Sequence, residues 1–250
     1  GHWRAVFTAQ NGGDIWNLCT ARSSDASLRE WSWEGDGFAN QSAVAKDHGP
    51  RRGLHYNAFR DVIRPWRDPN DGQWYIAIGA GTLQHGSAAE LFRSPGSGPE
   101  ELVSWTYVHT LFEHQLPQQA AIPSNWMFEC PDLFDLTASD GTNVSVFMAS
   151  PFWTNNATFP TNRSTSTSCI GLEQVSAWTG SPRSWSLNKT FEPHSLEPAG
   201  LDGGEFYAAK TGEAVLSDGR RRRILFGWLC KIHACFSTSL ASASLLLTKA

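Results

Sequence analysis

The sequence predicts an all-β protein built as a β-propeller, and three observations lead to this fold class. Strand signals are frequent along the 250 residues, as short segments rich in β-branched and aromatic residues between Gly, Pro, Asn, Asp and Ser. Helix signals are scarce, because no stretch longer than about twelve residues keeps apolar side chains at helical spacing. A weak tryptophan repeat favours a propeller over the alternative, a β-sandwich with recurrent tryptophan.

Seven segments are predicted as strands because each is short, rich in β-forming residues and bounded by turn-forming residues. In chain order they are residues 5–9, 15–21, 74–80, 144–149, 170–177, 206–210 and 224–229. The basic run at residues 220–223 leads directly into the last of them. This run therefore predicts a turn and a strand start rather than a polyanion site.

The internal repeat is centred on Trp31, Trp105 and Trp185, each followed by Ser or Thr and then by an apolar residue. A predicted pair of strands precedes each tryptophan, as in a propeller blade that ends in a Trp-bearing edge strand. The repeat is longer than the ~40–50 residues of compact blades. The surplus is expected in long loops, where binding sites commonly lie.

Composition excludes several classes of partner. An apolar fraction of 40% and a mean hydropathy of −0.34 are typical of a soluble globular protein. The net charge of −4 is too small to indicate a nucleic-acid partner. Residues 236–250 are too short and too polar to span a membrane. The 12 tryptophans are expected as core anchors, with a minority as platforms that stack on ligands such as sugars.

Five N-glycosylation sequons favour a secretory-pathway protein, which is secreted or delivered to a vacuole. They begin at Asn40, Asn143, Asn156, Asn162 and Asn188. The five cysteines do not form a dense disulfide scaffold, and no spacing of Cys and His resembles a zinc site. No signal peptide is visible at the start, so the chain resembles a mature or truncated form.

The stretch around Glu129 is the most informative one for function. Aromatic and apolar residues flank this glutamate, and Cys130, Pro131 and Asp132 follow it directly. Desolvation raises the pKa of a carboxyl group, so such a glutamate can hold a proton near neutral pH and deliver it to a leaving group. Pro131 is expected to push Cys130 into an extended conformation, at a strand end or stiff turn. The alternative is a half-buried glutamate paired with an arginine.

A second cluster spans residues 57–75. Asp61 lies there among apolar residues, where an unpaired carboxylate is costly. It is therefore either paired with Arg60 or Arg64 or held there for a function. Residues 68–72 give a strong turn signal directly before a strand, so Asp68 is predicted to be a turn residue.

Taken in chain order, the motifs around Asp61 and Glu129 resemble those of glycoside hydrolase family 32, which contains invertases, inulinases and fructosyltransferases. Glu129 and Cys130 match the family's Glu-Cys motif. Asp61 stands at the aspartate of its Arg-Asp-Pro motif, although Val62 replaces the proline. Residues 201–208 and 222–228 resemble its Asp-Tyr-Gly…Phe-Tyr-Ala and Arg-Arg…Gly-Trp stretches. The resemblance covers roughly residues 3–228.

The resemblance implies a five-bladed β-propeller followed by a β-sandwich. We expect an incomplete propeller over residues 1–229, with about one blade missing at the N-terminus, and a divergent tail over 230–250 in place of the sandwich. The family's nucleophilic aspartate, in a Trp-Met-Asn-Asp-Pro-Asn-Gly motif, has no counterpart before Phe59. Residues 66–72 superficially resemble that motif, but they follow Asp61 too closely to be it.

The resemblance also implies a chemistry, the retaining hydrolysis of β-fructofuranosides such as sucrose or a fructan, and it implies no metal and no organic cofactor. Glu129 would be the acid/base and Asp61 the stabiliser of the transition state. The implied substrate-binding residues are Arg60, Trp126, Asp202 and Phe59. Without the nucleophile, we expect the chain alone to be weakly active or inactive. The alternatives are a non-catalytic sugar-binding propeller and a five-bladed propeller glycosidase acting on arabinosides or other glycosides.

Overall fold

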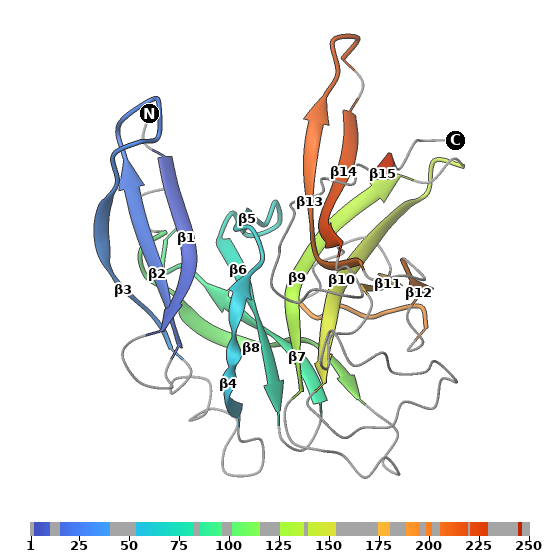
Figure 1. The fold of residues 1–250 in the computed structure, drawn as a ribbon, viewed down its shortest axis with the longest axis horizontal. Helices are drawn as coiled ribbons and strands as arrows, with labels where there is room; N and C mark the ends of the chain where they lie inside the picture. The colour runs from blue at the N-terminus through green and yellow to red at the C-terminus, as the bar shows by residue number, and fades with distance from the viewer. Residues whose placement is uncertain are drawn as a thin grey trace. The chain divides into compact units, whose positions relative to one another are not determined.

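The computed structural model describes residues 3–10, 16–40, 54–82, 86–96, 102–115, 126–137, 140–153, 175–180, 189–195, 199–201, 206–219, 221–229 and 245–246. Every regular element within these ranges is a β-strand, which confirms the all-β prediction. The strands form four sheets in this part of the chain (Figure 1).

The first two sheets come from the N-terminal half of the sequence. The first has the order β1-β2-β3, with bounds Trp3–Gln10, Trp16–Ser23 and Ser32–Asn40. The second has the order β4-β6-β7-β8, with bounds Leu54–Val62, Trp74–Thr82, Gly86–Arg93 and Thr106–Gln115. The short strand β5, Trp66–Arg67, pairs with β6. The pairings within both sheets are antiparallel.

The other two sheets follow in the sequence. The third has the order β12-β11-β10-β9, where β9 is Trp126–Thr137, β10 is Asn143–Trp153, β11 is Ser176–Gly180 and β12 is Ala199–Gly200. The fourth has the order β13-β14-β15, with bounds Phe206–Val215, Arg221–Leu229 and Leu245–Leu246. Each sheet thus has its earliest strand at one edge, namely β1, β4, β9 or β13.

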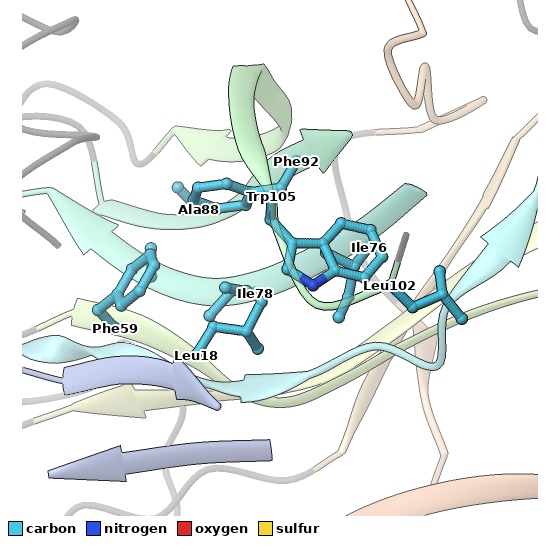
Figure 2. Close-up of a cluster of buried hydrophobic side chains, with 9 residues drawn as sticks. Leu18, Phe59, Ile76, Ile78, Ala88, Phe92, Leu102 and Trp105 are labelled. Carbon is cyan, nitrogen blue, oxygen red and sulfur yellow. The ribbon is translucent and has the colours of Figure 1, made fainter. Parts of the chain in front are cut away.

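The chain divides into two compact units, and the first holds residues 1–116, 125–127 and 185–190. Its core forms where Leu18 of β2 packs against the second sheet (Figure 2). The buried members from that sheet and its edge are Phe59, Ile76, Ile78, Ala80, Ala88, Phe92, Leu102 and Trp105. Ile76, Ile78 and Ala80 alternate along β6, as expected for one face of a strand.

The second unit holds residues 117–124, 128–184 and 191–250 and has its own core. Its buried members are Phe134, Val146, Met148, Val175, Ala177, Phe206, Ala209 and Leu225. A further aromatic group joins Phe128 of β9 to Phe147 and Trp178, with ring centroids 5.0 and 5.4 Å apart. Phe128 is fully buried, so this packing anchors β9 directly before Glu129.

Most of the strand predictions are confirmed. The segments predicted at 5–9, 15–21, 74–80, 144–149, 206–210 and 224–229 coincide with β1, β2, β6, β10, β13 and β14. The segment at 170–177 is described only from residue 175, and β11 begins at Ser176. The repeat predicts that each edge strand bears its tryptophan, whereas Trp31 and Trp105 each lie one residue before an edge strand, β3 and β8 respectively. Trp185 lies outside the described residues.

Candidate active site

Glu129 lies on β9, the edge strand of the third sheet, and only 5% of its surface is exposed. This burial confirms the water-poor environment that its neighbours predict. The hydroxyl of Tyr207, on β13, donates a hydrogen bond to Glu129 Oε2. A hydrogen bond to a carboxylate is strengthened where little water competes for it. The structure therefore pairs Glu129 with a tyrosine hydroxyl.

The residues that follow Glu129 are bound to β13 at successive points. Lys210 Nζ donates to the Pro131 carbonyl oxygen at 2.5 Å. Asp132 is 7% exposed, and its Oδ2 accepts hydrogen bonds from the Thr211 amide at 2.8 Å and from the Thr211 hydroxyl at 2.5 Å. The other oxygen, Oδ1, accepts from the Leu133 amide at 3.0 Å. These contacts, which we call the β9–β13 clamp, hold the Glu-Cys-Pro-Asp segment in place.

Two residues in this region have a left-handed backbone. The φ angle is 50° at Cys130, directly after Glu129, and 54° at Ala208, directly after Tyr207. The predicted extended conformation of Cys130 is therefore wrong. A left-handed conformation costs a non-glycine residue roughly 1–2 kcal/mol, and the clamp on the following two residues offsets that cost. On β13 the pairing register shifts between Tyr207 and Lys210, which marks a β-bulge.

Arg223 supports the clamp from β14. Its Nη1 donates to the Thr211 hydroxyl oxygen at 2.9 Å, and its guanidinium lies 4.6 Å from the centroid of the Phe134 ring. Arg223 Nη2 also lies 3.8 Å from Glu213 Oε2. The basic run predicted as a strand start thus begins β14 at Arg221, and its fourth arginine, Arg223, contacts the clamp.

Asp61 lies on β4, the edge strand of the second sheet, and is half-buried. Its φ angle is 64°, and the pairing register with β6 shifts between Arg60 and Val62. Asp61 is thus the extra residue of a β-bulge, a device that redirects a side chain and is common near active sites. Its amide donates to the Thr8 hydroxyl oxygen at 3.3 Å.

The remaining predicted site residues have different placements. Arg60 is half-buried on β4 beside Asp61. Phe59 has 0% of its surface exposed and packs edge-on against Phe92 in the core, with ring centroids 6.0 Å apart. This is a correction to the predicted substrate contact, because a fully buried ring has no surface to offer a sugar. Trp126 begins β9, but its side chain lies outside the described residues, as does all of Asp202.

Sequence reasoning missed the residues of β13 that contact the Glu-Cys-Pro-Asp segment, namely Tyr207, Lys210 and Thr211. Within residues 201–208, the family resemblance points to Asp202 alone as a site residue. Two signals were available there. A tyrosine and a lysine inside a short strand carry polar ends that require partners when they are half-buried.

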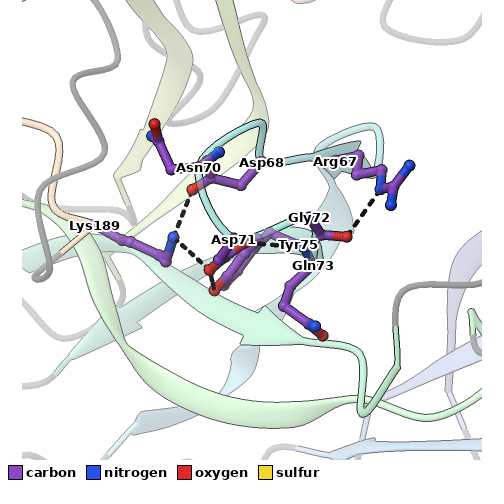
Figure 3. A network of polar contacts seen from close by, with 8 residues as sticks. All are labelled: Arg67, Asp68, Asn70, Asp71, Gly72, Gln73, Tyr75 and Lys189. Atoms are coloured by element: carbon purple, nitrogen blue, oxygen red, sulfur yellow. Dashed lines mark hydrogen bonds and ion pairs between the residues drawn. The ribbon is translucent and has the colours of Figure 1, made fainter.

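Asp68 begins a turn, as predicted, but its side chain has 0% exposed surface. Its Oδ1 accepts from the Asn70 amide at 2.8 Å, and its Oδ2 lies 2.5 Å from Lys189 Nζ (Figure 3). Lys189 Nζ also lies 2.9 Å from Asp71 Oδ2 and 4.5 Å from the centroid of the Tyr75 ring. This buried ion-pair cluster occupies the Asp68 carboxylate.

The cluster shifts the pKa of its members. Burial alone would raise the pKa of the Asp71 carboxyl, but hydrogen bonds from Lys189 and the Gln73 amide outweigh it and lower the pKa. Burial alone would lower the pKa of Lys189, but its bonds to the two aspartates raise that pKa above the ordinary value. Both shifts favour the charged forms at neutral pH.

Within the described ranges, no group of three or more His, Cys, Asp or Glu side chains is placed to hold a metal ion. None of the described segments forms a helix long and apolar enough to cross a membrane.

The fold and the site define a β-propeller protein with buried acidic residues on the edge strands of its sheets. Its structure is similar to the crystal structure of fructan 1-exohydrolase IIa from Cichorium intybus, with a TM-score of 0.60 at 19% identity. That alignment covers 90% of this chain and 37% of the other. The model of the glycosyl hydrolases family 32 N-terminal domain matches residues 3–238, and the chain belongs to this family. The number of blades stays a prediction.

Relatives in the same family are longer than this chain. A fructan 1-exohydrolase from Aegilops tauschii is 29% identical over 229 residues, which cover 87% of this chain and 32% of the relative. The beta-fructofuranosidase insoluble isoenzyme CWINV3 from Arabidopsis thaliana is 25% identical over 224 residues, which cover 88% and 33%. The chain thus spans about a third of the length of these relatives.

Proposed function

We propose that this chain forms the acid/base-bearing part of a glycoside hydrolase that acts on β-fructofuranosides, sucrose or a fructan. One observation carries the proposal: Glu129 is 5% exposed, accepts a hydrogen bond from Tyr207, and begins a segment clamped to β13. A buried and fixed carboxyl group suits proton transfer to a leaving group. The fructan exohydrolase and β-fructofuranosidase names of the relatives support the substrate class.

In the proposed mechanism, Glu129 first acts as an acid. It protonates the oxygen that links fructose to the leaving sugar while a nucleophilic carboxylate attacks the anomeric carbon. Glu129 then acts as a base and removes a proton from the water that hydrolyses the fructosyl intermediate. A retaining mechanism of this kind needs the two carboxyl groups about 5–5.5 Å apart.

Asp61 is proposed as the transition-state stabiliser. Its left-handed bulge holds the carboxylate on an edge strand, and it would accept hydrogen bonds from fructosyl hydroxyls. Such a charge-assisted bond is worth about 1.5–3 kcal/mol. Arg60, Trp126 and Asp202 are proposed as further contacts with the sugar.

The nucleophile has no counterpart among the motifs of the 250-residue sequence. We therefore propose that the chain binds fructosides but hydrolyses them weakly or not at all on its own. This feature also favours a second candidate function, a sugar-binding propeller without catalysis. A nucleophile-bearing segment would restore hydrolysis if the chain is part of a hydrolase. It would leave a non-catalytic sugar-binding propeller without turnover.

The decisive experiment measures binding and turnover separately. Calorimetry with sucrose, 1-kestose and inulin tests the chain, with Asp61→Asn and Glu129→Gln as site variants and the exposed Asp135→Asn as the control. Turnover is then measured by fructose release, before and after the natural upstream coding sequence is joined to the chain. Restored hydrolysis that Glu129→Gln abolishes supports the hydrolase, and binding without turnover supports the second candidate.

A panel of chromogenic glycosides addresses substrate class. Turnover of arabinosides with no response to fructosides would refute the fructoside proposal. Hydrolysis by the 250-residue chain alone, lost in Glu129→Gln, would refute the expectation that the chain alone is inactive.

The proposed location is the secretory pathway, on the strength of the sequons. Asn143 is exposed at the start of β10, whereas Asn156, Asn162 and Asn188 lie outside the described residues. Expression in plant cells followed by N-glycosidase treatment tests this proposal. A drop in mass on treatment supports it, and an unchanged mass contradicts it.

A further inference from the structure

We propose that Tyr207 is a positioning residue for Glu129: its hydroxyl fixes one carboxylate oxygen and stabilises the ionised form. The inference rests on the proposed function, in which Glu129 changes protonation state twice. It starts from the hydrogen bond between the Tyr207 hydroxyl and Glu129 Oε2, which joins β13 to β9.

The backbone geometry around the two residues supports this role. In a regular strand, successive side chains point to opposite faces. Here the residue directly after each partner is left-handed, Cys130 after Glu129 and Ala208 after Tyr207. The described residues contain five non-glycine residues with positive φ, and two of them flank this one hydrogen bond. Backbone strain that recurs on both sides of a side-chain pair indicates that the pair is held in its geometry for a function.

The contact between Tyr207 and Glu129 is also held rigidly by its surroundings. The β9–β13 clamp binds Pro131 to Lys210 and Asp132 to Thr211 within the four residues that follow the pair. Asp132 is itself buried and accepts three hydrogen bonds. The two strands therefore cannot slide past each other without breaking these bonds. The Tyr207 hydroxyl is kept at the Glu129 carboxylate through the catalytic cycle.

The Tyr207 hydroxyl also affects the ionisation of the Glu129 carboxyl group. A donor to a carboxylate favours the ionised form, and the effect is larger where water is excluded. Because Glu129 Oε2 accepts the hydrogen bond from the Tyr207 hydroxyl, the proton that Glu129 transfers is assigned to Oε1. In the acid step that proton leaves Oε1 for the glycosidic oxygen, and in the base step a proton from water returns to Oε1. Tyr207 keeps its own proton throughout, so it does not transfer a proton in either step.

The test follows the ionisation of Glu129 directly and needs no turnover. The 250-residue chain is labelled with ¹³C at the glutamate side-chain carboxyl groups and titrated by NMR, and loss of a signal in Glu129→Gln identifies Glu129. Tyr207→Phe should raise the titration midpoint of Glu129 by about one pH unit. The matched control is Tyr107→Phe, which removes a hydroxyl that donates to the buried Glu90 at 3.0 Å. It should leave the Glu129 midpoint unchanged.

A second variant keeps the test informative if Tyr207→Phe does not fold. Replacing Tyr207 with 3-fluorotyrosine preserves the shape of the ring and makes its hydroxyl a stronger donor, so the Glu129 midpoint should fall. An unchanged midpoint in a folded Tyr207→Phe chain, or in the fluorotyrosine chain, overturns the proposal. A shifted midpoint, together with no fructoside hydrolysis even after the natural upstream coding sequence is joined to the chain, supports the positioning role while the proposed function fails, so the two failures are distinguishable.

Discussion

Lys189 Nζ lies 2.5 Å from Asp68 Oδ2, although 121 residues separate the two in the sequence. Asp68 is fully buried, and the side chain of Lys189 is 13% exposed. The pair ties the turn before β6 to a distant segment of the first unit. Charges this deeply buried are stable only when each has a partner, so the two residues depend on each other.

The first prediction concerns removal of this lysine. Lys189→Met should lower the free energy of unfolding by about 3–5 kcal/mol, because it leaves the buried Asp68 carboxylate without its cation. Urea denaturation of the chain measures the change. The control is Arg221→Met at the exposed Arg221–Glu213 pair, where the loss should stay within about 1 kcal/mol. Equal losses in the two variants would contradict the role given to Lys189.

The second prediction is a pH dependence of stability set by the same cluster. The folded pKa of Asp71 lies below its ordinary value of 3.8, so its contribution is present above about pH 4 and is lost as the pH falls further. The folded pKa of Lys189 lies above its ordinary value of 10.5, so its contribution is present below that pH and is lost as the pH rises through the folded pKa.

The measurement is the free energy of unfolding of the chain from pH 3 to pH 11. In Lys189→Met the alkaline fall should become shallower, because the lysine that loses its proton there is gone. The acid fall should become shallower too, because Asp71 then has a pKa closer to its ordinary value. Identical pH profiles for the two proteins would show that other groups set the dependence.

The sequence was sufficient for the parts of the fold that local pattern encodes. The strands β1, β6, β10 and β13 can be predicted because each consists of β-forming residues between turn-forming residues. The water-poor setting of Glu129 could also be predicted, because the apolar residues responsible are its neighbours in sequence. Phe59 shows the limit of the same reasoning, since an aromatic residue beside a motif is as suited to the core as to a ligand.

The pairings across long sequence distances could not be predicted. Nothing near Asp68 indicates Lys189, and nothing near Glu129 indicates Tyr207, because each partner is delivered by the packing of other strands. The backbone of Cys130 follows the same rule. The local preference of a residue before proline is for an extended conformation, and tertiary contacts of Pro131 and Asp132 override it.

The third prediction concerns Asp132, the acidic member of the clamp. Asp132→Ala should lower the free energy of unfolding by about 2–4 kcal/mol, because the half-buried Thr211 amide and hydroxyl and the buried Leu133 amide lose their acceptor. Thermal and urea denaturation measure it. On the same strand, Asp135 is exposed and accepts a hydrogen bond from Ser145, so Asp135→Ala should cost about 1 kcal/mol or less because water can replace what an exposed group loses. A smaller loss for Asp132→Ala than for Asp135→Ala would remove the clamp as a stabilising element.

The fourth prediction tests the left-handed residue beside Tyr207. Ala208→Gly should raise the free energy of unfolding by up to about 1 kcal/mol, because glycine adopts a φ of 54° without the steric cost that alanine bears. The matched control is the next residue, since Ala209 is buried and does not have a positive φ. Ala209→Gly should instead lower the free energy of unfolding by about 0.5–1 kcal/mol or more, from added chain entropy and a lost buried methyl group.

The same pair of variants separates strain from packing at the proposed site. If the left-handed Ala208 serves to direct Tyr207, the more permissive glycine should loosen that tyrosine, and the Glu129 titration midpoint should rise in Ala208→Gly despite the gain in stability. Ala209→Gly should lower stability without moving the midpoint. If the Glu129 titration midpoint changes in step with the free energy of unfolding in both variants, Ala208 affects Glu129 only through the stability of the fold.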